Sequence, residues 1–529
     1  MIYVNSKNDA FARIVSKKYV DKTDLISFFN DCINSDDPFY CLVRPRRFGK
    51  TITANMLTAY YSKGCDSSEL FKNFKISKSP DYKKHLNKYD TISFNMNSFM
   101  VVKDENGDQF LDNLISTLCN DLKETYQEVF RDFPCKDNDL LGMLSTVAAV
   151  KSTQFVFIID EWDLVFRKYP NNTQLQNDFI TLLTLLFKSN FGESNIALAY
   201  MTGILPIKRY CNQSELNNFS EITMLNSFGL GEYMGFTEKE VQSICDKYAL
   251  DFVRTKEWYD GYIVDGVEIY NPYAIIALTK SKEYLSSWSG TASSKAIAEL
   301  IEVNYEGLRE DLARLISGQK LEFTVASKSS NALFNLNSKV SIFTCLIYLG
   351  YLGYDKEQGC IFIPNKDVRL EIEEVFLGTT VSDDNDIVKL SKKLFESLLN
   401  YDQKAVAGLI EQIHNSFASI NGYNNEESLR GIISMAMVWA YRYYSKPFFE
   451  LPSGKGFSDL VFLPLKGKLD NRPAIIFELK WNKSAQSAME QITSKNYIDK
   501  AKEHAQSVLL VAVNYSADTK KHTCLIESV

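Results

Sequence analysis

The sequence predicts an α/β protein built from several domains. Its 529 residues are too many for a single core, and 45% of them are hydrophobic, which provides apolar side chains for several compact units. In the first 230 residues, short apolar runs typical of buried strands alternate with amphipathic stretches typical of helices. This alternation favours a parallel sheet covered by helices, because parallel strands need long crossover connections.

The composition argues against several classes of protein. Ten cysteines without a CxxC pair and only four histidines favour neither a disulfide framework nor a zinc site. No apolar run reaches the roughly 18 to 20 residues that cross a bilayer, and the N-terminus lacks the order of a signal peptide, so we expect a cytoplasmic protein without membrane contact. The net charge of −7 argues against unspecific coating of nucleic acid but leaves room for a local basic groove.

The predicted elements of this first part follow from hydrophobic periodicity. Apolar runs of strand length predict strands, and apolar side chains at helical spacing predict helices. The expected strands are Phe39–Val43, Thr91–Met96, Phe155–Ile159 and Ile196–Gly203, and the expected helices are Leu25–Phe29, Ile52–Tyr61, Phe110–Phe130 and Leu175–Phe187.

The stretch RPRRFGKT, residues 44–51, directly follows the first of these strands. Gly49, Lys50 and Thr51 match the end of the P-loop pattern GxxxxGK[ST], in which the loop N–H groups and the lysine bind phosphates and the hydroxyl binds Mg²⁺. Arg44 occupies the position of the first glycine. The alternative is an ordinary turn before a solvated helix. We expect this loop to bind ATP and Mg²⁺ through Arg46, Arg47, Phe48, Gly49, Lys50 and Thr51.

Two carboxylates, Asp160 and Glu161, follow the apolar run FVFII about a hundred residues later. In P-loop NTPases a strand-end aspartate holds the metal, and a neighbouring glutamate can activate water. The alternative is helix N-capping. We expect Asp160 to hold Mg²⁺ together with Thr51, and Glu161 to act in catalysis. Thr202, at the end of the last strand, is a candidate contact to the γ-phosphate, although a threonine there also suits a purely structural role.

The chain changes character after residue 235. Thr237 is the expected N-cap of a helix and Glu240 stands at its capping-box position. The region to about residue 370 is expected to be mainly helical and to end in a helix, Ser341–Tyr348, and a hairpin, the outline of a winged-helix unit. We therefore expect four domains: 1–235, an ATP-binding P-loop domain; 236–370, a helical and winged-helix-like region; 371–420, a helical bridge; and 421–529, a last α/β domain.

The last domain shows the order α-β-β-β-α-β and contains two acids and one lysine of interest. Asp459 lies in GFSDLVF, and Glu478 and Lys480 follow AIIF. Residues i and i+2 of a strand share one face, so Glu478 and Lys480 point the same way. Carboxylates bind Mg²⁺, which activates water, and a lysine can orient the nucleophile. We expect Asp459 and Glu478 to bind Mg²⁺ and the three residues to hydrolyse phosphodiester bonds.

These residues also have simpler interpretations. Glu478 and Lys480 would suit an exposed edge strand with a cross-strand ion pair. Glu426, at the start of the helix expected at 426–444, is a further catalytic candidate, but glutamate is favoured in any first helical turn. Gln491 and Tyr497, on the helix expected at 485–505, are second-rank candidates for substrate contact. The element order and the additional acid favour the nuclease interpretation.

Eight motifs occur in sequence: YVDKT, RPRRFGKT, FIIDEWD, MTGILPI, LNNF, GFTEKEV, WYDGY and YNPY. They resemble AAA-ATPase-like proteins joined to a C-terminal PD-(D/E)XK nuclease-superfamily domain, over nearly the whole chain. The resemblance implies a P-loop ATPase of the additional-strand type, a helical lid and a restriction-endonuclease-like α/β domain. It also implies that Arg44 follows the family's own pattern, whereas Ser458 replaces the motif's proline. The implied nucleotide site is Lys50, Thr51, Asp160 and Glu161, and the implied nuclease triad is Asp459, Glu478 and Lys480.

The favoured hypothesis is an ATP-dependent or ATP-regulated, Mg²⁺-dependent nuclease acting on nucleic acid, with DNA the favoured substrate and a homo-oligomer possible. A second hypothesis is a nucleotide-controlled binding switch whose last domain binds nucleic acid or a partner without cleavage. A third is a nuclease whose P-loop domain is only a scaffold.

Overall fold

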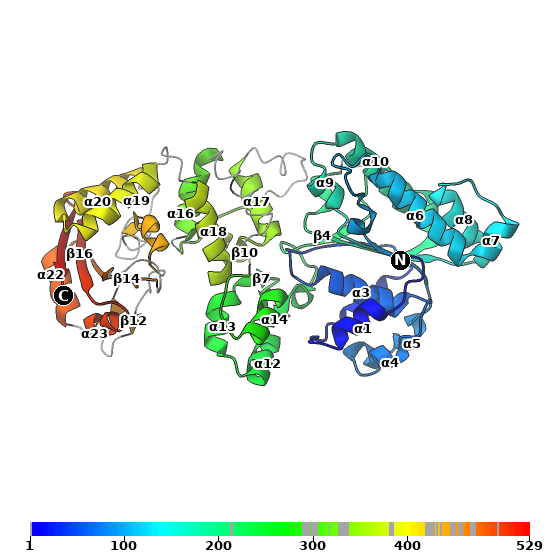
Figure 1. The fold of residues 1–529 in the computed structure, drawn as a ribbon, viewed down its shortest axis with the longest axis horizontal. Coiled ribbons are helices and arrows are strands. Elements are labelled where there is room, and N and C mark those ends of the chain that lie inside the picture. The colour runs from blue at the N-terminus through cyan, green and yellow to red at the C-terminus, as the bar shows by residue number, and fades with distance from the viewer. Residues whose placement is uncertain are drawn as a thin grey trace. The chain divides into compact units, whose positions relative to one another are not determined.

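The structure is a computed structural model (Figure 1). It divides into two compact units, the N-terminal unit (Met1–Ser287 and Phe323–Asp367) and the C-terminal unit (Trp288–Glu322 and Val368–Val529). The domain boundaries expected from the sequence stay predictions. The described residues are 3–211, 215–287, 298, 305–316, 318–325, 338–379, 386–417, 429, 432–433, 436–444, 451–452, 457–458, 460–465, 472–494 and 497–529.

A five-stranded parallel sheet forms the centre of the N-terminal unit, in the order β2-β3-β4-β1-β5. The four predicted strands are confirmed, and the short β5 is an addition. One strand, β4, lies between β1, which leads into the phosphate loop, and β3, which ends in Asp160, as the additional-strand type implies. The strands are β1 Phe39–Val43, β2 Asp90–Asn95, β3 Phe155–Asp160, β4 Ile196–Gly203 and β5 Ser220–Ile222.

Helices cover this sheet on two sides (Figure 1). α3 packs on β2, β3 and β4, while Leu118 of α6 and Leu183 of α10 share a core with Phe157 of β3. The predicted helix Phe110–Phe130 is wrong in one respect, because it breaks at Tyr126, whose hydroxyl donates to the buried carboxylate of Asp90. The helices are α1 Asp9–Val15, α2 Leu25–Cys32, α3 Lys50–Tyr61, α4 Ser68–Phe71, α5 Tyr82–His85, α6 Phe110–Thr125, α7 Gln127–Asp132, α8 Leu140–Lys151, α9 Leu164–Lys168, α10 Thr173–Phe187 and α11 Asn190–Asn195.

The rest of the N-terminal unit is mainly helical, as expected, but it also contains a small sheet that the sequence did not predict. The capping box of Thr237 and Glu240 is confirmed at the start of α12, and α17 is followed by the antiparallel pair β10 and β11, so helix and hairpin occur in the predicted order. The missed sheet, β6-β8-β7, turns at Asp265-Gly266, a dipeptide that favours hairpins. The elements are β6 Phe236–Thr237, α12 Glu238–Tyr248, α13 Phe252–Tyr259, β7 Tyr262–Val264, β8 Val267–Tyr270, α14 Pro272–Ser281, α17 Lys339–Leu349, β10 Gly353–Asp355 and β11 Cys360–Phe362.

The C-terminal unit contains a four-stranded mixed sheet in the order β14-β15-β16-β17. β15 and β16 run parallel, while β14 and β17 are antiparallel to their neighbours. α22 packs on β15 and β16, and α20 packs on β17. The strand β17 was not predicted from the sequence. The elements are α16 Leu308–Ile316, β9 Leu321–Glu322, α18 Lys366–Thr379, α19 Asp386–Leu399, α20 Gln403–Phe417, β12 Leu451–Pro452, β13 Phe457–Ser458, β14 Leu460–Phe462, β15 Ala474–Trp481, α22 Ala485–Ser494, α23 Tyr497–Lys502, β16 Val508–Ser516 and β17 Lys521–Ser528.

Two of the helices expected here need comment. The described parts of the segment 485–505 form two helices, α22 and α23, in place of one. Part of the helix expected at 426–444, including Glu426, lies outside the described residues, and Val438–Arg442 forms a 3-10 helix. A hydrophobic pattern alone does not distinguish an α-helix from a 3-10 helix, since both bury apolar side chains on one side.

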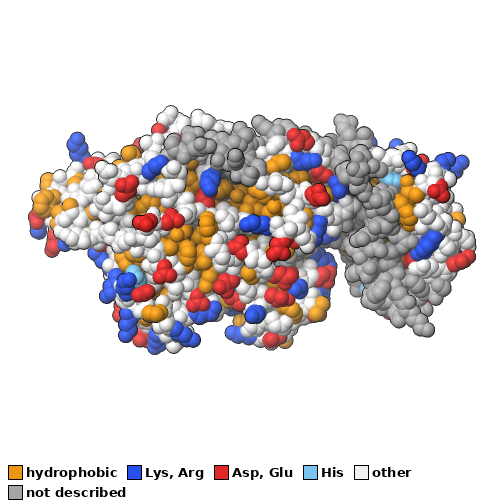
Figure 2. All heavy atoms as spheres, turned by 180° about the vertical axis from the view of Figure 1, so that it is seen from behind, with side chains coloured by type: hydrophobic (Ala, Val, Ile, Leu, Met, Phe, Trp, Pro, Cys, Tyr) orange, Lys and Arg blue, Asp and Glu red, His pale blue; other side chains and the backbone are white. Residues whose placement is uncertain are grey.

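The described surface carries mixed charge. Lysine and arginine side chains are interspersed with aspartate and glutamate on the face shown in Figure 2, without one continuous basic area. Within the part of the chain that the structure describes, no helix has both the length and the apolar content to cross a bilayer.

Candidate nucleotide and nuclease sites

The loop between β1 and α3 has the backbone form of a phosphate-binding turn. Arg47 and Gly49 adopt left-handed backbone angles, with φ of +70° and +79°. A Cβ atom at Gly49 would meet nothing within 4 Å, so the conformation, not the space, favours glycine there. α3 begins at Lys50, and its free N–H groups and positive dipole end point towards the loop.

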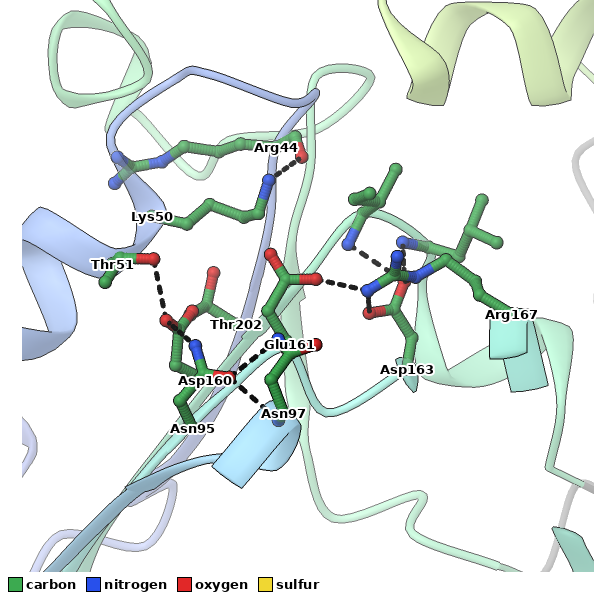
Figure 3. Close-up of polar contacts among 12 residues, drawn as sticks. Arg44, Lys50, Thr51, Asn95, Asn97, Asp160, Glu161, Asp163, Arg167 and Thr202 are labelled. Atoms are coloured by element: carbon green, nitrogen blue, oxygen red, sulfur yellow. Dashed lines mark hydrogen bonds and ion pairs between the residues drawn. The ribbon is translucent and has the colours of Figure 1, made fainter. Parts of the chain in front are cut away.

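The Lys50 side chain lies across the loop (Figure 3). Its ammonium donates hydrogen bonds to the carbonyl oxygens of Arg44, at 3.1 Å, and Pro45, at 2.9 Å. Lys50 is buried, and burial lowers the pKa of its ammonium to about 8. A buried cation whose partners are two neutral carbonyl groups is suited to bind an anion that enters the loop.

Asp160 gathers polar groups from two other segments (Figure 3). Its Oδ2 accepts hydrogen bonds from Thr51 Oγ1, at 2.7 Å, and from Asn95 Nδ2, at 2.6 Å. Its Oδ1 is buried and has no hydrogen-bond partner among the described residues, and burial raises the pKa of this carboxyl group. Asp160 therefore caps no helix. An orphaned carboxylate oxygen beside a hydroxyl group fits Mg²⁺, which prefers oxygen ligands.

Glu161 is held by an ion pair. Its backbone is left-handed, with φ of +60°, and its carboxylate accepts a hydrogen bond from Arg167 Nη2 on α9. Arg167 also binds the fully buried Asp163, with 3.1 Å between Nε and Oδ2. Asp163 accepts hydrogen bonds from the backbone N–H groups of Ile204 and Leu205, both at 3.0 Å. Arg167 is thus anchored at the sheet and reaches from there to Glu161.

The three loop arginines have different surroundings. Arg44, in place of the first glycine, is buried and donates through Nη1 to the Phe48 carbonyl oxygen, at 3.2 Å, and to Thr53 Oγ1, at 3.3 Å. Its side chain thereby ties the end of the loop to α3. Arg46 lines the cleft beside the loop, and burial lowers its pKa. Arg47 stacks on Tyr273, with 4.5 Å from its guanidinium carbon to the ring centre.

Thr202 faces the neighbouring strand. It pairs in register with Asp160, and its Oγ1 donates to the Leu42 carbonyl oxygen at 2.8 Å. This contact supports the structural alternative for Thr202, because the hydroxyl proton already has an acceptor within the sheet.

A cleft of about 630 Å³ extends from the phosphate loop towards α14. Its volume is that of a site for a ligand larger than a phosphate group. Three of the motifs that carry the family resemblance, YVDKT, GFTEKEV and YNPY, contribute residues to the lining of this cleft. Their presence in the resemblance was the signal in the sequence that could have assigned them to a site. The lining residues that the sequence analysis did not propose include Tyr19, Val20, Asn97, Arg167, Phe236, Pro272, Tyr273 and Ile276.

In the C-terminal unit, Glu478 and Lys480 lie side by side on β15. Lys480 Nζ is 3.2 Å from Glu478 Oε1, and the side chains are only 9% and 1% exposed respectively. β15 lies between β14 and β16, so the edge-strand interpretation is wrong: the two charges are inside the unit. Their face is the one covered by α22, since Ile476, two residues earlier, packs with Met489 of that helix.

Of the other nuclease candidates, the structure describes Gln491 and Tyr497. Asp459 and Glu426 lie outside the described residues, so their roles stay predictions. Leu460, which follows Asp459 in sequence, pairs with Phe477, which precedes Glu478. Gln491 is half-buried on α22, and Tyr497 begins α23.

Comparison with known proteins matches one segment of each unit to a family. Residues 9–210 match the AAA-ATPase-like family, described as a predicted AAA-ATPase, and residues 424–523 match a PD-(D/E)XK nuclease-superfamily family. The chain joins an AAA-ATPase-like domain to a PD-(D/E)XK nuclease-superfamily domain. The Asp160 cluster lies within the first of these domains, and the Glu478–Lys480 pair lies within the second.

Three single proteins are similar to this chain at 12 to 22% sequence identity. A protein of Azotobacter chroococcum mcd 1, described as an uncharacterized protein in the vnfD 5′ region, is 22% identical over 527 residues, which are 95% of this chain and 93% of that protein. The structure of the ORC2 protein of Aeropyrum pernix, as ADPNP and ADP complexes, is 12% identical, covers 71% of this chain and 94% of its own, and has a TM-score of 0.31. That of Cdc6p from Pyrobaculum aerophilum is 13% identical, covers 70% and 98%, and has a TM-score of 0.24.

Proposed function

We propose that this protein is a Mg²⁺-dependent nuclease that cleaves nucleic acid, with DNA as the favoured substrate. Its cleavage is controlled by ATP bound in the N-terminal unit. The observation that carries the proposal is the buried Glu478–Lys480 pair on a central strand of a PD-(D/E)XK domain. Burying two charges is costly, and a fold that only needed packing would gain more from apolar side chains there.

The nucleotide half of the proposal rests on the cleft. Lys50 and the N-terminus of α3 would bind the phosphates, and Thr51 and Asp160 would hold Mg²⁺, which would neutralise charge on the β- and γ-phosphates. Where ATP is hydrolysed, Glu161 takes a proton from water as the water oxygen bonds to the γ-phosphorus. The bond from that phosphorus to the bridging oxygen breaks, which releases ADP and inorganic phosphate.

The nuclease half rests on the charges of β15. Glu478, together with Asp459, would hold Mg²⁺, which activates water and stabilises charge on the phosphate. Lys480 is placed to orient that water or to bind the phosphate oxygen that becomes more negative. The water oxygen bonds to phosphorus and gives up one proton to solvent, one phosphorus–oxygen ester bond breaks, and the leaving oxygen takes up a proton from solvent.

A cleavage assay on single- and double-stranded DNA and RNA tests the proposal, with Mg²⁺ and with or without ATP. We expect cleavage by the wild type that Lys480→Ala abolishes, and a changed response to ATP in Lys50→Ala. Cleavage that survives Lys480→Ala would remove the nuclease assignment. ATP binding without cleavage of any substrate would favour the binding switch, and cleavage without ATP binding would favour the scaffold hypothesis.

The oligomeric state and the place in the cell also belong to the proposal. A cytoplasmic location is what we expect from the sequence, and a homo-oligomer is an alternative to a monomer that the sequence leaves open. Light scattering of the purified protein with and without ATP measures the oligomeric state.

A further inference from the structure

Three cationic side chains, those of Arg46, Lys50 and Arg167, line the phosphate cleft together with Glu161. Arg167 binds the Glu161 carboxylate directly. Among the carboxylates near Lys50, that of Glu161 most strongly opposes the lowering of the Lys50 pKa by burial. Burial, then Arg167, lower the pKa of Arg46, while Glu161 raises it. A negative group thus already lies where cations converge at the mouth of the phosphate loop.

The anchoring of Arg167 is independent of Glu161. Asp163 holds the guanidinium at Nε and at Nη2, with 3.1 Å and 3.2 Å to its two carboxylate oxygens, and Asp163 is itself fixed by two backbone N–H groups after β4. Arg167 can therefore exchange Glu161 for another partner while it stays bound to Asp163. Glu161, by contrast, has a left-handed backbone, a conformation that costs free energy for a residue other than glycine.

We propose that Arg167 is a positioning residue that holds Glu161 away from catalysis until a triphosphate binds: the terminal phosphate replaces the Glu161 carboxylate as the second partner of Arg167, and Glu161 is released to take the attacking water. This inference rests on the proposed nucleotide-binding function. It makes the cleft selective for ATP over ADP, because only ATP has a terminal phosphate that Arg167 can bind.

A carboxylate and a phosphate that compete for one guanidinium predict a measurable coupling. Removing the carboxylate strengthens binding of the triphosphate, because nothing has to be displaced. Removing the guanidinium weakens it, and the benefit of removing the carboxylate then disappears. A double-mutant cycle isolates this coupling from effects of each substitution alone.

The experiment is isothermal titration calorimetry of the full chain with Mg²⁺ and two probes, ADP and the non-hydrolysable β,γ-imido analogue of ATP. We expect Glu161→Gln to bind the analogue at least about threefold more tightly, and Arg167→Ala to bind it about tenfold or more weakly, the loss typical of one charge-assisted hydrogen bond. ADP binding should change by less than about threefold in both variants. In Glu161→Gln/Arg167→Ala, the gain from Glu161→Gln should be absent.

Two further variants separate this role from a structural one. Arg167→Lys keeps a positive charge beside Asp163 and should restore part of the preference for the analogue, and Arg131→Ala, on an exposed side chain of α7, is the matched control. Equal weakening of ADP and the analogue by Arg167→Ala would overturn the proposal, as would a gain from Glu161→Gln that persists without Arg167. A wild type that binds neither probe would remove the proposed nucleotide function itself, whereas binding without selectivity would remove only this inference.

Discussion

The phosphate cleft of the N-terminal unit and the Glu478–Lys480 pair of the C-terminal unit both place charge at the C-terminal half of an inner strand. They differ in how the charges are assembled. In the cleft, Asp160 on β3 meets Thr51 of α3 and Asn95 at the end of β2. On β15, the two charges are two residues apart on one strand and bind each other. The first set depends on tertiary structure, whereas the second depends mainly on strand geometry.

The difference also concerns what a ligand has to displace. Lys50 binds neutral carbonyl groups, and one oxygen of Asp160 has no hydrogen-bond partner among the described residues, so the cleft is open to a phosphate and a metal ion. Lys480 already has a carboxylate 3.2 Å away. Loss of either member of a buried ion pair leaves an uncompensated charge, which is strongly destabilising. Substitutions of the charged pair on β15 should therefore change stability and activity more than substitutions in the cleft change nucleotide binding.

The largest effect is expected for Lys480→Ala. It removes the cation beside Glu478 and should lower the initial rate of Mg²⁺-dependent cleavage by about a hundredfold or more, the effect typical of a positioned catalytic group. Plasmid nicking followed on gels measures this rate. The control is Lys483→Ala, an exposed lysine just after β15. A rate within threefold of wild type would show that the buried pair does not act in cleavage.

The next effect is expected for Asp160→Asn in the cleft. The amide keeps the shape of the carboxylate but loses the charge that would hold Mg²⁺, so the tightening of ATP binding by Mg²⁺ should fall by about tenfold. Calorimetric titration with ATP, with and without Mg²⁺, measures this change. Asp137→Asn, on a carboxylate 88% exposed, is the control. Unchanged enhancement by Mg²⁺ in Asp160→Asn would contradict the assignment of a metal site.

A smaller effect concerns stability at acidic pH in the C-terminal unit. Burial lowers the pKa of the His522 imidazole to about 3, whereas an unfolded histidine has a pKa of about 6.5. Between these values the unfolded state binds more protons, so the free energy of unfolding falls as the pH falls below 6.5, by about 2 kcal/mol at pH 5.

Urea denaturation at pH 7 and pH 5 measures this loss of stability. His522→Gln should remove it and thereby show a smaller difference between the two pH values, whereas His504→Gln, on the exposed surface, should behave as wild type. An equal pH dependence in wild type and His522→Gln would contradict the prediction.

The smallest effect is expected for Thr202→Val. The hydroxyl donates to the Leu42 carbonyl oxygen, so its removal should cost about 1 kcal/mol of stability and change ATP affinity by less than about threefold. Thermal unfolding and nucleotide titration of the same variant measure the two quantities. A tenfold loss of affinity at unchanged stability would instead support a direct contact from Thr202 to the γ-phosphate.

The parts of the candidate sites that sequence reasoning found are those with a local signature. A strand, a turn with Gly49 and a helix that starts at Lys50 are contiguous, and Asp160 ends a run of apolar residues. Asn95 and Arg167 were missed because each is an ordinary residue at its place in the sequence. Only the pairing of β2 with β3 brings Asn95 to Asp160, and only the turn of the chain into α9 brings Arg167 back to Glu161.

The sequence by itself determined the parallel sheet, the position of the phosphate loop and the shared face of Glu478 and Lys480, because each follows from hydrophobic periodicity or from strand geometry. Only the tertiary structure decided whether that face is exposed or buried, since the answer depends on α22 packing on β15. It also decided that Glu161 is held by Arg167 and that Thr202 is engaged with β1. These are contacts between side chains and segments distant in sequence, and their partners carry no mark in the pattern of either segment.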